Sequence, residues 1–245
     1  MINAHFPLGK KKAVHSPKTL KLAAYTVQLP PPPASVDWTG KVPSFPMFAN
    51  DRVGDCTIAA PGHMEQIWTA NAGRMFTPTE DQILADYSKI TGYNPQDPTT
   101  DRGAIELDVL NAWRQNGIAG RKIRAFMACH GLDDIKQSIA LLGGVYFGFA
   151  LPLSVRNKTS WDIDDSNPAY AEAGSWGGHA VNGAAYDQAS ITVISWGQKL
   201  VVSLPFVQRY CDEAYAIVTD DWIEADQKSP SGFNINQLMA DLAVL

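Results

Sequence analysis

One sequence feature limits the possible fold of this chain more than any other. It is a cysteine that follows a turn and begins an apolar stretch typical of a helix. Gly54 and Asp55 favour a turn, and small or apolar residues continue from Cys56 to Ala60. This order predicts a helix from Cys56 to about Ala72, with the thiol at its N-terminus. The helix dipole and the free N–H groups there stabilise a thiolate, which is the nucleophilic form. The competing interpretation is a buried cysteine that packs as a small apolar side chain.

A second stretch, Gly177 to Val181, supplies a histidine far downstream. His179 lies in an alternating segment that predicts a strand, from which its ring would project beside small residues. A lone strand histidine is usually structural. Paired with a cysteine at a helix N-terminus, it forms the thiolate–imidazolium arrangement of cysteine hydrolases. The two stretches therefore carry the prediction only together.

Composition limits the class of protein. The 245 residues suit one large domain or two small ones, and no apolar run approaches the ~18 residues of a membrane span. The N-terminus lacks the apolar core of a signal peptide. Three cysteines argue against a disulfide framework and for a reducing compartment (Cys56, Cys129 and Cys211). We expect a cytoplasmic protein, or one within a virus or phage particle, with no signal peptide and no membrane contact.

The N-terminal segment differs from the rest of the chain. Residues 1–35 show no sustained apolar period, and Pro30 to Pro33 predict a polyproline II rod. We expect an extended arm, too short and irregular to be a folded inhibitory propeptide. Five lysines and no acid precede Val36, so the remaining 15 basic and 25 acidic residues carry a net charge of −10 (the lysines are Lys10, Lys11, Lys12, Lys18 and Lys21). Such an arm can bind an acidic protein, a nucleic acid or the body of its own chain, or it can stay solvated. If the partner is another molecule, we expect a protein and not a nucleic acid.

Predicted helices come first and predicted strands follow. We expect helices over residues 56–72, 77–92, 105–116 and 132–142, the second with Thr77 as its N-cap, Pro78 at its first position and Glu80 completing a capping box. We expect strands over residues 145–150, 179–186, 191–196, 199–204 and 214–218, a polar loop over 154–178 and a short helix over 206–210. This order predicts an α+β fold with a cleft between its halves. The predicted layout is an arm over 1–35, a domain over 36–225 with a helical half to about 142 and a β half from about 143, and a tail with a short helix over 226–245.

The order and local sequence of these stretches resemble the papain-like cysteine peptidases over about residues 36–220. The matching stretches are the domain start at Val36-Asp37-Trp38, the nucleophile helix at Cys56, two further helical segments at Thr77–Leu84 and Ala104–Ile118, the histidine strand at Gly178–Val181 with Tyr186, and Ile194-Ser195-Trp196-Gly197 for the family's Asn-Ser-Trp-Gly. The compact NlpC/P60 and CHAP classes fit less well, because their histidine follows the cysteine much sooner. The resemblance implies a peptide or protein substrate, no cofactor, Cys56 as nucleophile and His179 as its base.

The resemblance also assigns the positions around that pair. Ile194 replaces the family's Asn that orients the histidine, and its side chain accepts no hydrogen bond, so Ser195 or a backbone carbonyl is left to substitute. Trp196 would shield the pair from water. Asn50 stands at the position of the family's oxyanion donor, a Gln. The family's half-cystine is replaced by Val53, and Arg102-Gly103 is the nearest match to its substrate-binding Gly-Gly.

Other constellations predict no metal site. His63 lies about 10 Å along the helix from Cys56, which favours a structural role. The Cys129-His130 pair has no second pair to complete a zinc site. Residues 162–167 begin like a calcium loop but lack its glycine and its terminal glutamate.

Two functions follow from the sequence. The first is a papain-like thiol hydrolase that cleaves peptide or isopeptide bonds with Cys56 and His179. The alternative is a weakly active or inactive papain-like protein that its N-terminal arm ties into a larger assembly, such as a virus or phage particle.

Overall fold

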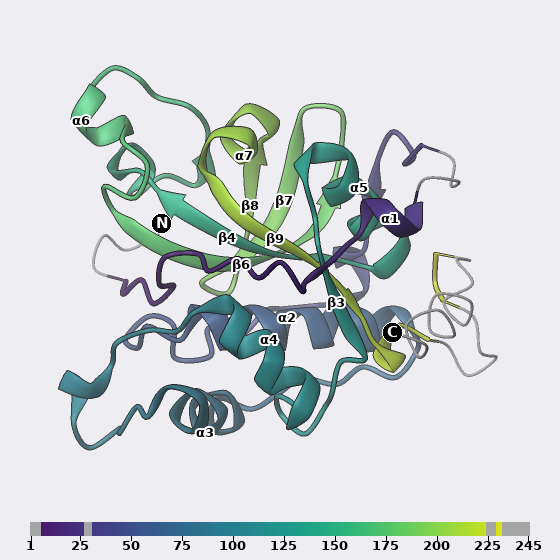
Figure 1. The fold of residues 1–245 in the computed structure, drawn as a ribbon, viewed down its shortest axis with the longest axis horizontal. Coiled ribbons are helices and arrows are strands. Elements are labelled where there is room, and N and C mark those ends of the chain that lie inside the picture. Colours follow the sequence, from purple (N-terminus) through teal and green to yellow (C-terminus); the bar gives the residue numbers. More distant parts are fainter. Residues whose placement is uncertain (1–5, 27–30, 224–228, 232–245) are drawn as a thin grey trace.

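A layer of helices packs against one side of a mixed sheet. The computed structural model describes residues 6–26, 31–223 and 229–231. In Figure 1, α2, α3 and α4 (Cys56–Asn71, Glu80–Thr91 and Glu106–Gln115) lie below the strands, and α5 and α7 (Gly131–Leu142 and Leu204–Tyr210) lie above them. Both sets of helices bury apolar side chains against the sheet, and one large core cluster joins them. The predicted α+β architecture is confirmed.

Helix α2 runs through the centre of the molecule. Every one of its residues is buried, because β6 covers one side of the helix and α3 and α4 cover the others. Pro61 lies in its second turn, and the Trp68 indole N–H donates to the Leu142 carbonyl at 2.9 Å. The predicted helix from Cys56 is confirmed, and it ends one residue before the predicted Ala72.

Helix α3 begins later than the sequence analysis predicted. Its N-cap is Thr79, whose hydroxyl accepts the Gln82 N–H while the Gln82 side chain accepts the Thr79 N–H. The predicted cap at Thr77 with Glu80 is wrong, because the Thr77 hydroxyl accepts from the Gln66 amide instead. The predicted end at Gly92 is confirmed, where the glycine takes the left-handed conformation at φ 78°.

The sheet has its predicted antiparallel half and further strands at its margins. The strands are β1 (Leu20–Lys21), β2 (Val36–Asp37), β3 (Ala125–Ala128), β4 (Val145–Leu151), β5 (Ser160–Trp161), β6 (Gly177–Tyr186), β7 (Ser190–Ser195), β8 (Gln198–Ser203) and β9 (Cys211–Val218). Within the described residues their order is β1-β3-β9-β4-β6-β7-β8-β5, and β2 pairs with β6. The predicted loop over 154–178 is only partly a loop, since it contains β5 and the short α6 (Pro168–Ala171). Short 3₁₀ helices link the elements at Thr39–Lys41, Pro98–Thr100, Leu153–Val155 and Asp220–Trp222.

The sheet side of the fold includes elements that precede residue 143. Strand β3 pairs antiparallel with β9, and α5 packs on β9 and β6, although both elements precede residue 143. Only α2, α3 and α4 form the helical layer below the sheet (Figure 1). Long-range pairing with β9 thus draws β3 into the sheet, although β3 precedes the predicted division at about 142.

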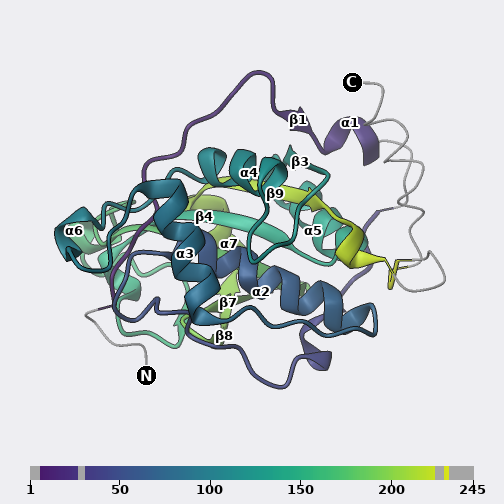
Figure 2. The ribbon, with the colours of Figure 1, turned by 90° about the horizontal axis from the view of Figure 1, so that it is seen from below.

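The N-terminal arm is held against the body of the same chain. Its residues 6–11 cross the junction between the helical layer and the strands, and the purple ribbon in Figures 1 and 2 then continues to β1, which pairs in parallel with β3, and to α1 (Ala23–Thr26). The strand β1 is extended, as the arm was predicted to be, whereas the four residues of α1 are helical. Pro30 and the predicted tail helix over 233–245 lie outside the described residues. Among the helices of the described ranges, none has the length and apolar content needed to cross a membrane.

Candidate active site

The turn before α2 places Cys56 at the helix N-terminus. Phe48 and Ala49 adopt left-handed backbone angles, with φ of 55° and 67°, and the Gly54 N–H donates to the Asp101 carboxylate at 2.7 Å. These constraints turn the chain and direct Cys56 into the first turn of α2. Its side chain is buried, with 1% of the residue exposed. As the first residue of a helix, Cys56 has an N–H with no intrahelical acceptor.

The histidine strand lies directly beside this cysteine. His179 is fully buried on β6, opposite Phe149 of β4. The next residue, Ala180, donates its N–H to the Cys56 Sγ atom at 3.5 Å. The fold therefore joins the two stretches that the sequence analysis singled out.

One hydroxyl and two indoles define the surroundings of the imidazole. Its Nε2 lies 2.7 Å from the Ser195 Oγ atom, whereas its Nδ1 has no hydrogen-bond partner among the described residues. The Trp196 ring stacks on it, with centroids 4.2 Å apart and planes at 13°, and Trp161 meets it edge-on at 6.3 Å. Trp196 thus stands where the sequence analysis expected a shield.

Ile194 is turned away from the histidine. Its side chain packs with Val42 and Ala184 in a separate apolar cluster, because successive strand residues face opposite sides of the sheet. Ser195, one residue further along β7, therefore faces His179. Of the two substitutes that the sequence analysis left open, the hydroxyl is the one in contact with the ring.

Asn50 and Asp55 lie buried in the turn beside the cysteine. The Asn50 amide donates to the Val53 carbonyl at 3.2 Å and also lies beside the Asp55 carboxyl. Asp55 immediately precedes Cys56 and is fully buried. Burial raises the pKa of its carboxyl well above the ordinary range, and the neighbouring Asn50 amide only partly opposes this.

Residues 6–11 of the arm lie directly over Cys56. Lys10 donates its N–H to the Gly178 carbonyl at 3.1 Å, and Lys11 donates to the Ala104 carbonyl at 2.8 Å. Ala104 in turn donates to the Gly9 carbonyl at 2.8 Å. The arm is thus bound through its backbone, between the Gly178 segment of β6 and the segment before α4.

Glycines make this close approach feasible. A Cβ on Gly9 would lie 1.6 Å from the Gly54 carbonyl oxygen, and a Cβ on Gly103 would lie 2.0 Å from the Gly9 oxygen. A Cβ on Gly178 would lie 2.2 Å from the Lys10 oxygen. We call this passage, walled by Gly54, Gly103 and Gly178, the glycine groove. Gly103, matched weakly to the family's Gly-Gly stretch, lies in its wall.

With the arm in the glycine groove, burial disfavours the charged forms of both Cys56 and His179. Burial raises the pKa of the Cys56 thiol to about 12, although the N–H groups of Ala180 and Gly9 favour the thiolate. Burial lowers the pKa of His179 to about 3. These directions oppose the predicted ion pair, because both side chains are buried away from the water that would solvate their charges.

The sequence analysis missed a cluster of acids beside the glycine groove. Glu106 of α4 and Glu213 of β9 are buried, and Asp212 is next to Glu213. Their contact is the ammonium group of Lys10, which lies 3.0 Å from Glu213 and 2.9 Å from Asp212. No local pattern indicates this cluster, because its members come from three distant segments.

The remaining candidates serve the packing of the fold. His63 Nε2 lies 2.9 Å from the Pro46 carbonyl oxygen, and burial lowers the pKa of its ring to about 4. In the loop that begins like a calcium site, the Asp164 carboxylate accepts from the backbone and hydroxyl of Ser166. Across the described ranges, no three His, Cys, Asp or Glu side chains are grouped to hold a metal ion.

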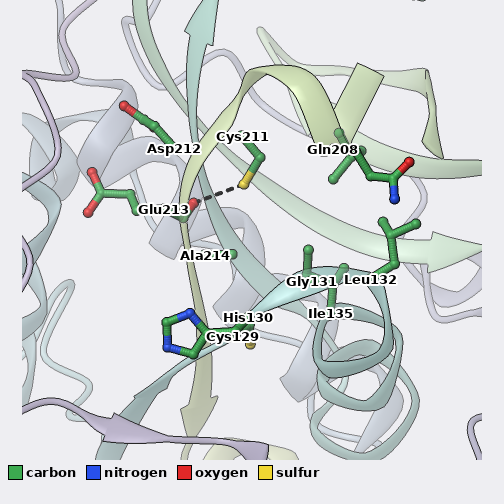
Figure 3. A pocket seen from close by; sticks show the side chains of 11 residues that line it. Cys129, His130, Gly131, Leu132, Ile135, Gln208, Cys211, Asp212, Glu213 and Ala214 are labelled. Carbon is green, nitrogen blue, oxygen red and sulfur yellow. Dashed lines mark hydrogen bonds between the residues drawn. The ribbon is translucent and has the colours of Figure 1, made fainter. Parts of the chain in front are cut away.

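A separate pocket of about 270 Å³ lies at the start of α5. Cys129 and His130 line one side of it, and Gln208 and Leu132 line another. Figure 3 shows the carboxyl groups of Asp212 and Glu213 pointing away from Gln208 and Leu132. Neither Cys56 nor His179 lines this pocket, so it is distinct from the candidate active site.

Solved structures share this arrangement of elements, whereas sequence comparisons find no relative. No family model matches the chain, and no curated protein matches it. Xylellain, a cysteine protease from Xylella fastidiosa, superposes with a TM-score of 0.66 at 16% identity, over 88% of this chain and 97% of its own. The chain has the papain-like fold.

Two further papain-like structures agree. The proCathepsin B S9 of Trypanosoma congolense superposes with a TM-score of 0.62 at 11% identity, over 89% of this chain and 87% of its own. The Carica candamarcensis cysteine protease CMS1MS2 superposes with a TM-score of 0.54 at 15% identity, over 76% of this chain and 99% of its own. At these identities the likeness concerns the fold, and activity is a separate question.

Proposed function

We propose that this protein is a papain-like thiol hydrolase that cleaves peptide or isopeptide bonds. The observation that carries the proposal is the contact of Cys56, at the start of α2, with the histidine strand, where Ser195 and Trp196 hold the His179 ring. The printed names of the similar structures are those of cysteine proteases, which supports a peptide or protein substrate.

In the proposed reaction, His179 takes the Cys56 proton and the thiolate attacks the substrate carbonyl carbon. The oxyanion is stabilised by the Cys56 N–H and, after it turns from Val53, the Asn50 amide; one such donor contributes ~10²–10³ in rate. The C–N bond then breaks, and His179 protonates the leaving amine. Water, deprotonated by His179, hydrolyses the thioester and restores the thiol.

The glycine groove must be vacated for this reaction. While Gly9 lies against Gly54 and its N–H faces Cys56, a substrate carbonyl has no access to the sulfur. Displacing the arm would also readmit water, which favours the thiolate and the imidazolium. The active form is therefore the chain with residues 6–11 out of the glycine groove.

The test uses the full chain with Gly9→Ala. The new Cβ cannot fit 1.6 Å from the Gly54 oxygen, so residues 6–11 leave the glycine groove. Gly40→Ala is the matched control, since a Cβ at Gly40 meets nothing within 4 Å. We expect Cys56 of the Gly9→Ala chain to be alkylated rapidly by iodoacetamide below pH 8, as measured by mass spectrometry, and the chain to cleave a mixed peptide library.

His179→Ala in the Gly9→Ala chain supplies the decisive comparison. We expect it to lower the cleavage rate by ~10²–10⁴ and to return Cys56 to the pH dependence of a free thiol, with a pKa of ~8.5. If Cys56 of the Gly9→Ala chain already behaves as a free thiol and no peptide is cut, the hydrolase proposal fails.

That outcome would favour the alternative of an inactive docking protein. Its specific support is that the arm lysines other than Lys10 are exposed and available to an acidic partner (Lys11, Lys12, Lys18 and Lys21). The docking of β1 on β3 of the same chain shows that at least part of the arm is bound by its own body.

A further inference from the structure

Lys10 differs from the other lysines of the arm. Its side chain is 1% exposed and enters the body of the protein, whereas its neighbour Lys11 is exposed. A lysine is almost never fully buried unless it is paired. Its ammonium lies 2.9 Å from the Asp212 carboxylate, 3.0 Å from that of Glu213 and 3.2 Å from the Lys11 carbonyl.

The pocket around Lys10 is built by the body of the fold. The Tyr215 hydroxyl donates to Glu213 Oε2 at 2.9 Å, which leaves Oε1 facing the ammonium. Glu106 on α4 is fully buried, and neither of its carboxyl oxygens has a hydrogen-bond partner among the described residues. Its interaction with Lys10 is electrostatic. A buried carboxyl without a partner is costly, so the pocket is arranged to receive a cation.

Gly148 on β4 lacks a side chain, and this leaves the space that the Lys10 side chain occupies. A Cβ there would lie 2.1 Å from the Lys10 Cε atom, 2.7 Å from the Glu213 Cγ atom and 2.8 Å from the Glu106 Oε1 atom. Any larger residue would fill the space that the lysine stem now occupies. The pocket therefore combines room for a long side chain with carboxyl groups at its end.

The pocket opens next to the candidate nucleophile. Gly9 lies against Gly54 with its N–H toward Cys56, and Lys10 is the next residue. A peptide in the glycine groove would thus place a side chain in this pocket when its backbone passes Cys56.

The acids of the pocket favour a bound cation. Asp212 and Glu213 lie 2.9 Å and 3.0 Å from the ammonium, and burial together with Glu213 raises the pKa of Glu106 well above its ordinary range. Burial opposes the charge on Lys10, but Glu106, Glu213 and Asp212 outweigh it and raise the pKa of the lysine. When Lys10 leaves with the arm, Glu213 is left as a buried carboxylate that lacks its cation.

We propose that the pocket of Glu106, Glu213 and Gly148, which we call the acidic pocket, selects substrates that carry a lysine or arginine within two residues of the cleaved bond. Lys10 is the internal occupant that such a side chain replaces. This inference rests on the proposed hydrolase function.

The first experiment measures specificity in the full chain with Gly9→Ala. Peptide libraries with Lys, Arg, Leu, Gln or Glu fixed at one position are digested, and the cut sites are identified by mass spectrometry. We expect Lys or Arg at one position to raise kcat/KM about tenfold or more over Leu. Adding Glu213→Gln should remove most of this preference, whereas Glu172→Gln, an exposed acid, should leave it unchanged.

The second experiment does not depend on cleavage and covers the case in which Glu213→Gln fails to fold. In the otherwise unchanged chain, Lys10→Met leaves the acidic pocket without its cation and Lys11→Met alters an exposed neighbour. We expect Cys56 alkylation about tenfold faster in Lys10→Met, because the arm is released, and little change in Lys11→Met.

The outcomes separate the two proposals. If Gly9→Ala cuts no peptide and its Cys56 behaves as a free thiol, the hydrolase itself is overturned. If it cuts peptides with no basic preference, or keeps the preference in folded Glu213→Gln, only the acidic pocket is overturned. An unchanged alkylation rate in Lys10→Met would also contradict the proposal, because the pocket would then not bind the lysine.

Discussion

At the scale of single residues, the candidate site depends on what surrounds the imidazole. Among the residues that the structure describes, His179 has no carboxylate or amide partner, and its side chain bonds to the Ser195 hydroxyl. Two neutral groups, a thiol and an imidazole, are the stable forms while the site is dry. The proposed ion pair therefore requires that water enters the site and that Ser195 and Trp196 already hold the His179 ring in position.

Ser195 is predicted to position His179 without touching the substrate. Ser195→Ala removes the acceptor of the Nε2 proton, so we expect kcat/KM of the Gly9→Ala chain to fall about tenfold. Since that acceptor stabilises the imidazolium, its loss should lower the pKa of His179 and shift the alkaline limb of the rate profile to lower pH. Rates measured across pH check this. Ser195→Thr keeps a hydroxyl and should retain the profile, and an unshifted limb in Ser195→Ala would contradict the positioning role.

At the scale of elements, local signals decide the helices but not always their first residue. The sequence analysis took Thr77 as the cap of α3, with Glu80 three residues later. The choice falls on Thr79 because the Thr77 hydroxyl is bound to the Gln66 side chain of α2. A tertiary contact thus moves the start of α3 by two residues.

Thr79→Ala is predicted to destabilise the protein by about 1 kcal/mol, the usual effect of losing an N-cap side chain. The reason is that the Gln82 N–H loses its acceptor at the start of α3. Urea unfolding followed by circular dichroism measures this free energy of unfolding. Thr79→Ser retains the hydroxyl and should lie within a few tenths of a kcal/mol of the parent, whereas equal stability of the alanine variant would argue that the cap contributes nothing.

At the scale of the whole molecule, the arm connects both layers of the fold. Residues 9–11 bond to β6 and to the segment before α4, and further on the Leu22 N–H donates to the Ala128 carbonyl of β3 at 3.0 Å. These two attachments lie on separate parts of the body, as the purple ribbon in Figure 2 shows. The first can open while the second remains closed.

Gly9→Ala is predicted to release only the first attachment. The amide hydrogen bonds of Lys10, Lys11 and Ala104 exist only while residues 9–11 are docked, so we expect faster hydrogen exchange at these three amides. Exchange at the Leu22 amide should not change. Exchange resolved by NMR or by fragment mass spectrometry measures both, with Gly40→Ala as the control. Equal acceleration at Leu22 would show that the arm leaves as one unit.

Much of the fold was accessible from the sequence because its signals are local. The turn before Cys56, the apolar run of α2, the apolar periods of α4 and α5, and the alternation around His179 each lie within a short stretch of chain. The order of helices and strands follows from these stretches, and the resemblance of that order to a known family supplied the expectation that Cys56 and His179 act together. The same information left the partner of the imidazole open between Ser195 and a backbone carbonyl.

The tertiary structure alone decided which distant segments meet. Residues 6–11 could dock on this chain or on another, and only the glycine groove, with its exact fit to Gly9, shows where they lie. The acidic pocket joins Lys10, Glu106 and Glu213, each of which reads locally as a surface charge. Burial decides their chemistry, since desolvation depends on everything that packs around a group and not on its neighbours in the chain.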